Sequence, residues 1–229
     1  MPDLADILAS LPAITTFSAV TGIFITAGLL ILLRGWASAL LALMIQYLLL
    51  AWLLTTVIPL PLALIKALMG AIACVILYWS ARRTGDAPTS PFKPLELDDN
   101  ARREAINAAT GFSMRMPFRV GALLLAALAT YGLATRYPLP EMTLEAGLAC
   151  TWLTVVALVL LALSESPLRI GMALLTWMMA FEMFYVTWER SLTIAGFWGI
   201  ATLFVALGAG YLTSVRGAPL PAATEEEQS

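Results

Sequence analysis

The feature that most constrains this chain is a series of apolar runs, each about as long as a lipid bilayer is thick. The hydrocarbon core of a bilayer is about 30 Å thick, and a helix of about 20 residues crosses it. Seven such runs lie between polar breaks, at 13–33, 37–57, 62–80, 120–135, 142–163, 168–188 and 192–214. The sequence therefore predicts an all-α, polytopic membrane helix bundle of about seven transmembrane helices.

Composition excludes several classes of protein. Charged residues make up 12% of the chain, against about 25% in soluble domains. With 13 Lys and Arg residues against 15 Asp and Glu residues, the chain has no basic surface for nucleic acid. A soluble enzyme, a nucleic-acid-binding protein and a disordered chain are therefore excluded.

The residues that usually hold cofactors are scarce. The chain has no histidine, so His-ligated haem, zinc and copper, and Ser-His-Asp catalysis, would need a partner chain's imidazole. Its two cysteines, Cys74 and Cys150, both fall inside apolar runs, where a disulfide framework or a CxxC metal site is not expected. We expect neither a cofactor nor a metal of its own.

Basic residues predict the orientation of the chain. Cytoplasmic loops of membrane proteins carry an excess of Lys and Arg. If 81–118 is cytoplasmic, ten basic residues lie on that side and two, Arg136 and Arg190, lie outside, with Lys66 left within a span. We expect a multi-pass protein of the inner (cytoplasmic) membrane, with its N-terminus outside and its C-terminus in the cytoplasm.

This orientation divides the chain into four segments. Residues 1–80 carry the first three spans, 81–118 form a cytoplasmic loop, 119–214 carry the last four spans, and 215–229 form a solvated cytoplasmic tail. In the loop, Asp98, Asp99 and Asn100 can cap a short helix over 101–110 that Gly111 ends. The prolines and glycine of 84–94 predict irregular structure before it. The loop either lies on the membrane surface or docks a cytoplasmic partner.

The first three and last three spans share one plan. In each group an arginine, Arg34 or Arg169, opens the middle span, and a polar residue, Gln46 or Glu182, follows twelve or thirteen positions later. The fourth span would connect two units of the same orientation. We expect a parallel duplication of a three-helix unit, an arrangement known among membrane proteins; chance similarity of two apolar hairpins is the alternative.

Glu182, Lys66 and Gln46 are the candidate site residues. A carboxylate within a span is costly and marks a functional site by default, and burial disfavours its charged form. Glu182 therefore either relays protons or makes a structural hydrogen bond or ion pair. Lys66 either extends outward to the membrane surface or pairs with Glu182 on a proton path. Gln46 either joins helices by hydrogen bonds or lines a water wire. Two further residues, Trp152 and Trp177, fall well inside spans and are expected to pack there, with quinone or lipid-tail contacts as the alternative.

The segment Arg34-Gly-Trp-Ala-Ser-Ala-Leu-Leu-Ala-Leu-Met-Ile-Gln46, followed by Leu64-Ile-Lys66, resembles component E of the membrane-bound hydrogenase 4 family. That family is similar in its three-helix unit to the K subunit of complex I and the C subunit of cation/proton antiporters. In those units an arginine opens the second helix, and a carboxylate about eleven residues on serves the proton path. Gln46 and Glu182 stand near that place in the two halves, and Lys66 resembles the third-span lysine of component E. The second carboxylate of those units is missing here, which implies a reduced, structural relative.

Three functions remain open at this point. The first is a non-catalytic subunit of a multi-subunit ion-translocating or electron-transfer complex, such as a membrane oxidoreductase of respiratory or photosynthetic electron transport. Its partners would be other membrane subunits and the lipid bilayer, without nucleic acid. The second is a self-contained small transporter or channel with its site between the two units. The third is a membrane-embedded enzyme acting on lipid or quinone. The low polar content of the spans favours the first over the second, because transporters need polar lining.

The orientation can be tested with reporters. A reporter fused after Ser229 or inserted near Pro88 should report the cytoplasm, and one at the N-terminus should report the outside, because ten of twelve flanking basic residues then lie inside. Two termini on the same side would show that the number of spans is even.

Overall fold

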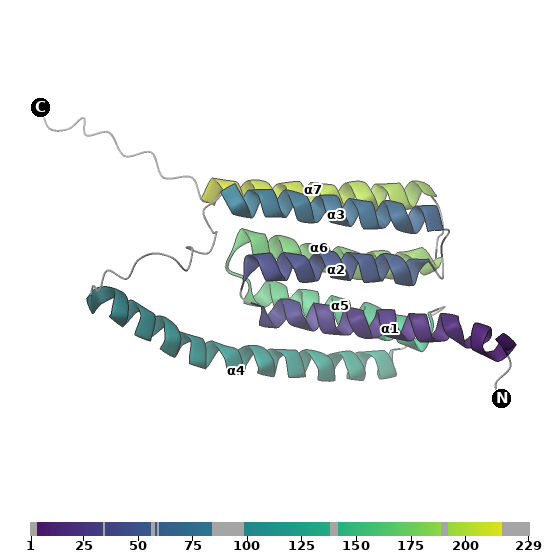
Figure 1. Ribbon diagram of the computed structural model, residues 1–229, viewed down its shortest axis with the longest axis horizontal. Helices are drawn as coiled ribbons and strands as arrows, with labels where there is room; N and C mark the ends of the chain where they lie inside the picture. The colour runs from purple at the N-terminus through teal and green to yellow at the C-terminus, as the bar shows by residue number, and fades with distance from the viewer. Residues whose placement is uncertain are drawn as a thin grey trace, which may run out of the picture.

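The computed structural model describes residues 4–33, 35–55, 58, 60–83, 99–137, 142–188 and 192–216. This part of the chain folds into seven α-helices. They are α1 (Leu4–Leu32), α2 (Trp36–Leu54), α3 (Leu60–Arg83), α4 (Asp99–Arg136), α5 (Leu144–Leu163), α6 (Pro167–Trp188) and α7 (Leu192–Arg216). Figure 1 shows them running along one long axis, as helices that span a bilayer must.

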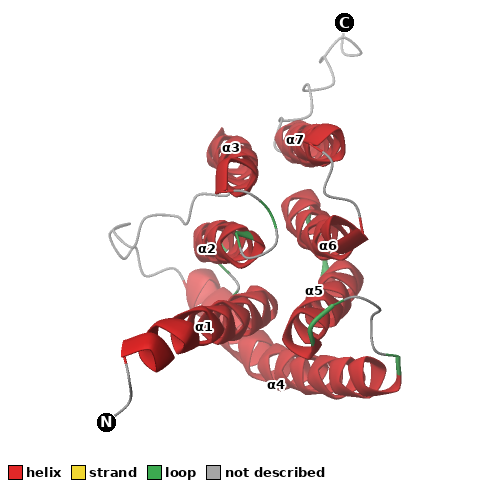
Figure 2. Cartoon of the chain, turned by 90° about the vertical axis from the view of Figure 1, so that its right-hand side faces the viewer, coloured by secondary structure: helices red, strands yellow, loops and turns green. Residues whose placement is uncertain are grey.

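The helices form two layers of three. Figure 2 shows α1, α2 and α3 in one column and α5, α6 and α7 in the other, with α4 across the ends of both. Across the two layers α1 packs on α5, α2 on α6 and α3 on α7. Each helix of the first unit therefore lies beside its counterpart in the second and runs in the same direction. A parallel duplication of a three-helix unit is compatible with this arrangement and stays a prediction.

The apolar runs of the sequence form helices at nearly the predicted positions. Six helices in the described part of the chain are long and apolar enough to cross a membrane, and α1 contains the shorter apolar stretch Phe17–Leu32. The outer faces carry large apolar side chains, such as Leu125 and Leu128 on α4 and Phe204 on α7, each more than two-thirds exposed. The protein is therefore a multi-pass membrane protein.

The prediction of a separate short helix before the fourth span is wrong. Residues 101–110 are helical, but the helix does not end at Gly111: α4 is continuous for 38 residues and passes through Pro117. A glycine inside a helix costs only about 1 kcal/mol relative to alanine, which the neighbouring helical turns can outweigh. Figure 1 shows α4 curving beyond the end of the other helices. The expected irregular stretch 84–94 and the tail 217–229 lie outside the described residues.

The two units are joined by contacts at different depths. The ring of Trp152 on α5 stacks on Phe24 of α1, with centroids 5.1 Å apart, and its Nε1 donates to the Phe24 carbonyl at 3.2 Å. Ser80 on α3 donates to the carbonyl of Gly210 on α7. Trp152 is buried, which confirms that it packs inside the bundle. Trp177 is instead 42% exposed.

Close helix approach depends on small residues. A Cβ added at Gly171 of α6 would lie 2.4 Å from the Cβ of Ala209 on α7, and both atoms are fixed by their backbones. By contrast, nothing lies within 4 Å of a Cβ added at the exposed Gly208. Small residues at such positions let membrane helices pack closely, so α6 and α7 pack at a distance that only glycine at position 171 permits.

Gly171→Ala should therefore destabilise the protein by about 1–3 kcal/mol, the usual cost of overpacking. Gly208→Ala is the matched control. It should leave the fold unchanged or stabilise it by up to about 1 kcal/mol through helix propensity. The unfolding midpoints of both variants can be measured by heating the purified protein in detergent and monitoring the folded fraction by size-exclusion chromatography. Equal midpoints for the two variants would contradict the close α6–α7 contact.

Candidate functional site

Two charged side chains that are 116 positions apart in the sequence meet inside the bundle. Lys66 on α3 donates through its Nζ to Oε1 of Glu182 on α6 and forms an ion pair with it. Lys66 is 8% exposed and Glu182 7% exposed. The pair joins α3 to α6, which belong to different columns of helices in Figure 2.

Both partners lie at the same depth. Lys66 follows the start of α3 at Leu60 by six residues, and Glu182 precedes the end of α6 at Trp188 by six residues. These two helix ends are at the same end of the bundle (Figure 1). At 1.5 Å per residue, the pair lies about 9 Å inside the helix ends, within the hydrocarbon region.

Pairing lowers the free-energy cost of placing these two charges inside the membrane. An isolated charge at the centre of a span costs about 2.5–3.5 kcal/mol on insertion scales, whereas an ammonium beside a carboxylate is neutral as a unit. The Lys66 side chain therefore turns inward to Glu182, and the alternative that it extends to the membrane surface is not what the structure shows.

Gln46, the third candidate, lies in α2 between the helices that carry the pair. Its side chain is fully buried, and neither Oε1 nor Nε2 has a hydrogen-bond partner among the described residues. Because α2 packs against α1, α3 and α6, the amide faces protein rather than lipid. Within the described part of the chain, no hydrogen bond joins the Gln46 amide to another helix, and its role stays a prediction.

Tyr47 extends this polar region toward α3. A Cβ added at Gly70 would lie 2.3 Å from the Tyr47 ring, so the ring lies directly against the α3 backbone. Gly70 is four residues after Lys66, which is about one helical turn. The buried Tyr47 hydroxyl, like the Gln46 amide, has no partner among the described residues. Sequence analysis missed Tyr47, although a tyrosine in the middle of an apolar run is a signal that could have found it.

Arg34 and Arg169 are the arginines that precede the middle span of each three-helix group. Arg34 lies outside the described residues. Arg169 at the start of α6 donates to the Leu33 carbonyl at the end of α1, at 3.2 Å, and Arg119 of α4 donates to the Ile31 carbonyl at 3.3 Å. Cations favour the C-terminal end of a helix, where carbonyls lack partners. These two arginines therefore tie α4 and α6 to α1 at the end that the sequence predicts to be cytoplasmic.

The ion pair has no metal-binding character. Within the helices that the structure describes, no three His, Cys, Asp or Glu side chains gather in a group that could hold a metal ion.

In comparisons with protein-family models, curated proteins and solved structures, the chain has no significant match.

The energy of the pair can be measured with a double-mutant cycle. Removing one partner leaves the other buried and unpaired, so Lys66→Met or Glu182→Gln alone should cost about 3–5 kcal/mol. The double variant should cost clearly less than the sum, since neither charge remains. Unfolding midpoints in detergent report all three variants.

The control for this cycle combines Lys66→Met with Glu165→Gln. Glu165 follows α5 at the opposite end of the bundle, so these two changes should add within about 0.3–0.5 kcal/mol. Additive effects in the Lys66 and Glu182 cycle as well would show that the two side chains do not interact energetically.

Proposed function

We propose that this protein is a non-catalytic integral membrane subunit of a multi-subunit ion-translocating or electron-transfer complex, and that Lys66, Glu182 and Gln46 contribute to a proton path through it. The observation that carries the proposal is the buried Lys66–Glu182 ion pair. The proposed site of action is the inner membrane, with the N-terminus outside.

The ion pair suits proton transfer for a simple chemical reason. If the Lys66 ammonium passes its proton to the Glu182 carboxylate, an amine and a carboxylic acid result, and the site stays neutral throughout. Burial penalises both charged forms, so the charged and neutral arrangements differ less in free energy than they do in water. Such a site can accept a proton on one side and release one on the other without leaving a net charge in the membrane.

Gln46 and Tyr47 support this role by their positions. Gln46 lies on α2, which packs against both α3 and α6, and its amide can donate and accept hydrogen bonds. The Tyr47 hydroxyl can also do both, and its ring lies one turn along α3 from Lys66. Polar groups that have no protein partner inside a membrane protein are suited to carrying protons to a buried titratable site.

The apolar character of the bundle supports the role of a subunit. The window of α4 that crosses the membrane is 17% buried, and those of α3 and α7 are 33% buried. These helices offer broad faces for lipid or for larger membrane subunits. The resemblance to the hydrogenase 4 component E and complex I K subunit, in which a carboxylate of the middle helix serves the proton path, points to the same kind of complex.

The proposal is tested by purifying the tagged chain from its native membranes and measuring the complex that it brings with it. We expect larger membrane subunits to co-purify. We also expect the variant Lys66→Met/Glu182→Gln to assemble but to lower proton-coupled turnover, because it lacks both titratable groups. Gly208→Ala serves as a control that changes a lipid-facing position.

Two results would contradict the proposal. Transport activity of the isolated chain in liposomes would favour the alternative of a self-contained transporter or channel. Equal turnover of the double variant and the parent, at matched yield of the complex, would leave the ion pair a structural role alone.

A further inference from the structure

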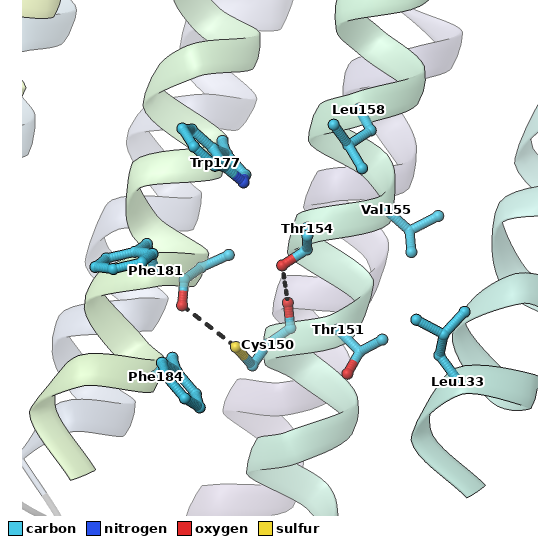
Figure 3. A pocket seen from close by; sticks show the side chains of 10 residues that line it. Leu133, Cys150, Thr151, Thr154, Val155, Leu158, Trp177, Phe181 and Phe184 are labelled. Atoms are coloured by element: carbon cyan, nitrogen blue, oxygen red, sulfur yellow. Dashed lines mark hydrogen bonds between the residues drawn. The ribbon is translucent and has the colours of Figure 1, made fainter. Parts of the chain in front are cut away.

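A lateral cavity lies on the second unit, away from the ion pair. It has a volume of about 320 Å³ and is lined by residues of α4, α5 and α6. Figure 3 shows α5 as its floor, Trp177, Phe181 and Phe184 of α6 along one side, and Leu133 of α4 on the other. This volume is at the lower end of the range for ligand pockets, about 300–1,000 Å³.

The thiol and the hydroxyls that line the cavity donate hydrogen bonds within the protein. The thiol of Cys150 donates to the Ala180 carbonyl at 3.3 Å, as Figure 3 shows. The hydroxyls of Thr151 and Thr154 donate to the carbonyls four residues earlier, at 2.8 and 2.9 Å. No ionisable side chain other than this thiol lines the cavity. The lining thus offers aromatic and aliphatic surface to a ligand. Its thiol and hydroxyls donate to the protein backbone, which leaves the indole N–H of the partly exposed Trp177 as the remaining donor among these lining residues.

The cavity is open to the interior of the bilayer. Trp177 is ten residues past the start of α6 at Pro167, which is about 15 Å and therefore near the centre of a 30 Å hydrocarbon core. Leu133, Leu158 and Trp177 are each between 42% and 55% exposed. An occupant therefore enters sideways from the membrane, at the depth of acyl chains and not of headgroups.

The cavity lies between α4 and α6. α4 packs on α5 and α1, whereas α6 packs on α5, α2 and α7. The membrane-crossing window of α4 is 17% buried, the lowest share among the six long spans. Material in the cavity would touch Leu133 of α4 and Trp177 of α6 at once, and so would add packing between them.

We propose that this cavity binds one acyl chain of a membrane phospholipid. The chain would fill the space between the helices and stabilise the packing of α4 against α5 and α6. The match is one of polarity: an uncharged acyl chain fits a lining that is mostly aromatic and aliphatic and whose thiol and hydroxyl donors are bonded to the backbone. This inference does not depend on the proposed function, because the cavity lies on the opposite face of α6 from Glu182. At 100° per residue, Glu182 points about 160–200° from Ala180 and Phe184.

The test is fluorescence quenching by a phospholipid whose acyl chain is brominated. The lipid is titrated into delipidated protein in detergent, and the Trp177 signal is taken as the difference between the parent and Trp177→Phe. We expect the Trp177 signal to be lost at equimolar lipid and to change little thereafter. Thr154→Phe, which fills the cavity, should abolish this quenching, and Val155→Phe provides a second filling variant if the first folds poorly.

The matched control places a tryptophan at the same depth on an open face. Phe204 is 70% exposed near the middle of α7, and Phe204→Trp in the Trp177→Phe background should lose emission only at a large excess of lipid. Parallel quenching of both tryptophans would overturn the proposal, because it would indicate ordinary boundary lipid. Displacement of the equimolar phospholipid by an equimolar isoprenoid alcohol would also overturn it, by identifying a different chain as the ligand.

Discussion

Hydrocarbon cannot solvate a charge, and the arrangement of this bundle depends on how that constraint is met. Lys66 and Glu182 are both buried, and each would be costly alone. Their contact requires that α3 and α6, one helix from each unit, keep a fixed depth relative to each other. A slip of one turn, about 5.4 Å, would separate the charges and leave both unpaired. The pair therefore sets the register between the two units, and the apolar contacts around it fill the space that this register leaves.

The two three-helix units differ most in their buried polar residues. Gln46 and Glu182 hold corresponding places after Arg34 and Arg169, and both are buried. In the second unit the polar residue is a carboxylate whose cation comes from the first unit. In the first unit it is a neutral amide, beside a tyrosine whose ring fills the space over Gly70. Among the described residues, Lys66 is the one buried basic side chain, and it pairs with Glu182. The neutral Gln46 needs no cation of its own.

Sequence patterns predicted the spans because the bilayer imposes a length and a polarity that local composition records directly. They predicted Lys66, Glu182 and Gln46 as candidates for the same reason, since polar residues in apolar runs stand out. They left the partner of Lys66 open, because a contact across 116 positions is decided by how α3 and α6 pack. Gly111 was misread because a local helix-stop signal was weaker than the helical turns on both sides. The cavity beside Trp177 was not predicted, because residues of three helices line it and the sequence of any one helix contains no pattern that indicates a cavity.

Helix α6 connects these features. It packs on α2, α5 and α7, it reaches the end of α1 through Arg169, and it holds Glu182 on one face and the wall of the cavity on the other. At the cavity, the carbonyl of Ala180 accepts from the thiol of Cys150. The ion pair and the cavity are therefore built on different faces of one helix. The packing of α6 on α2, α5 and α7 positions both at once.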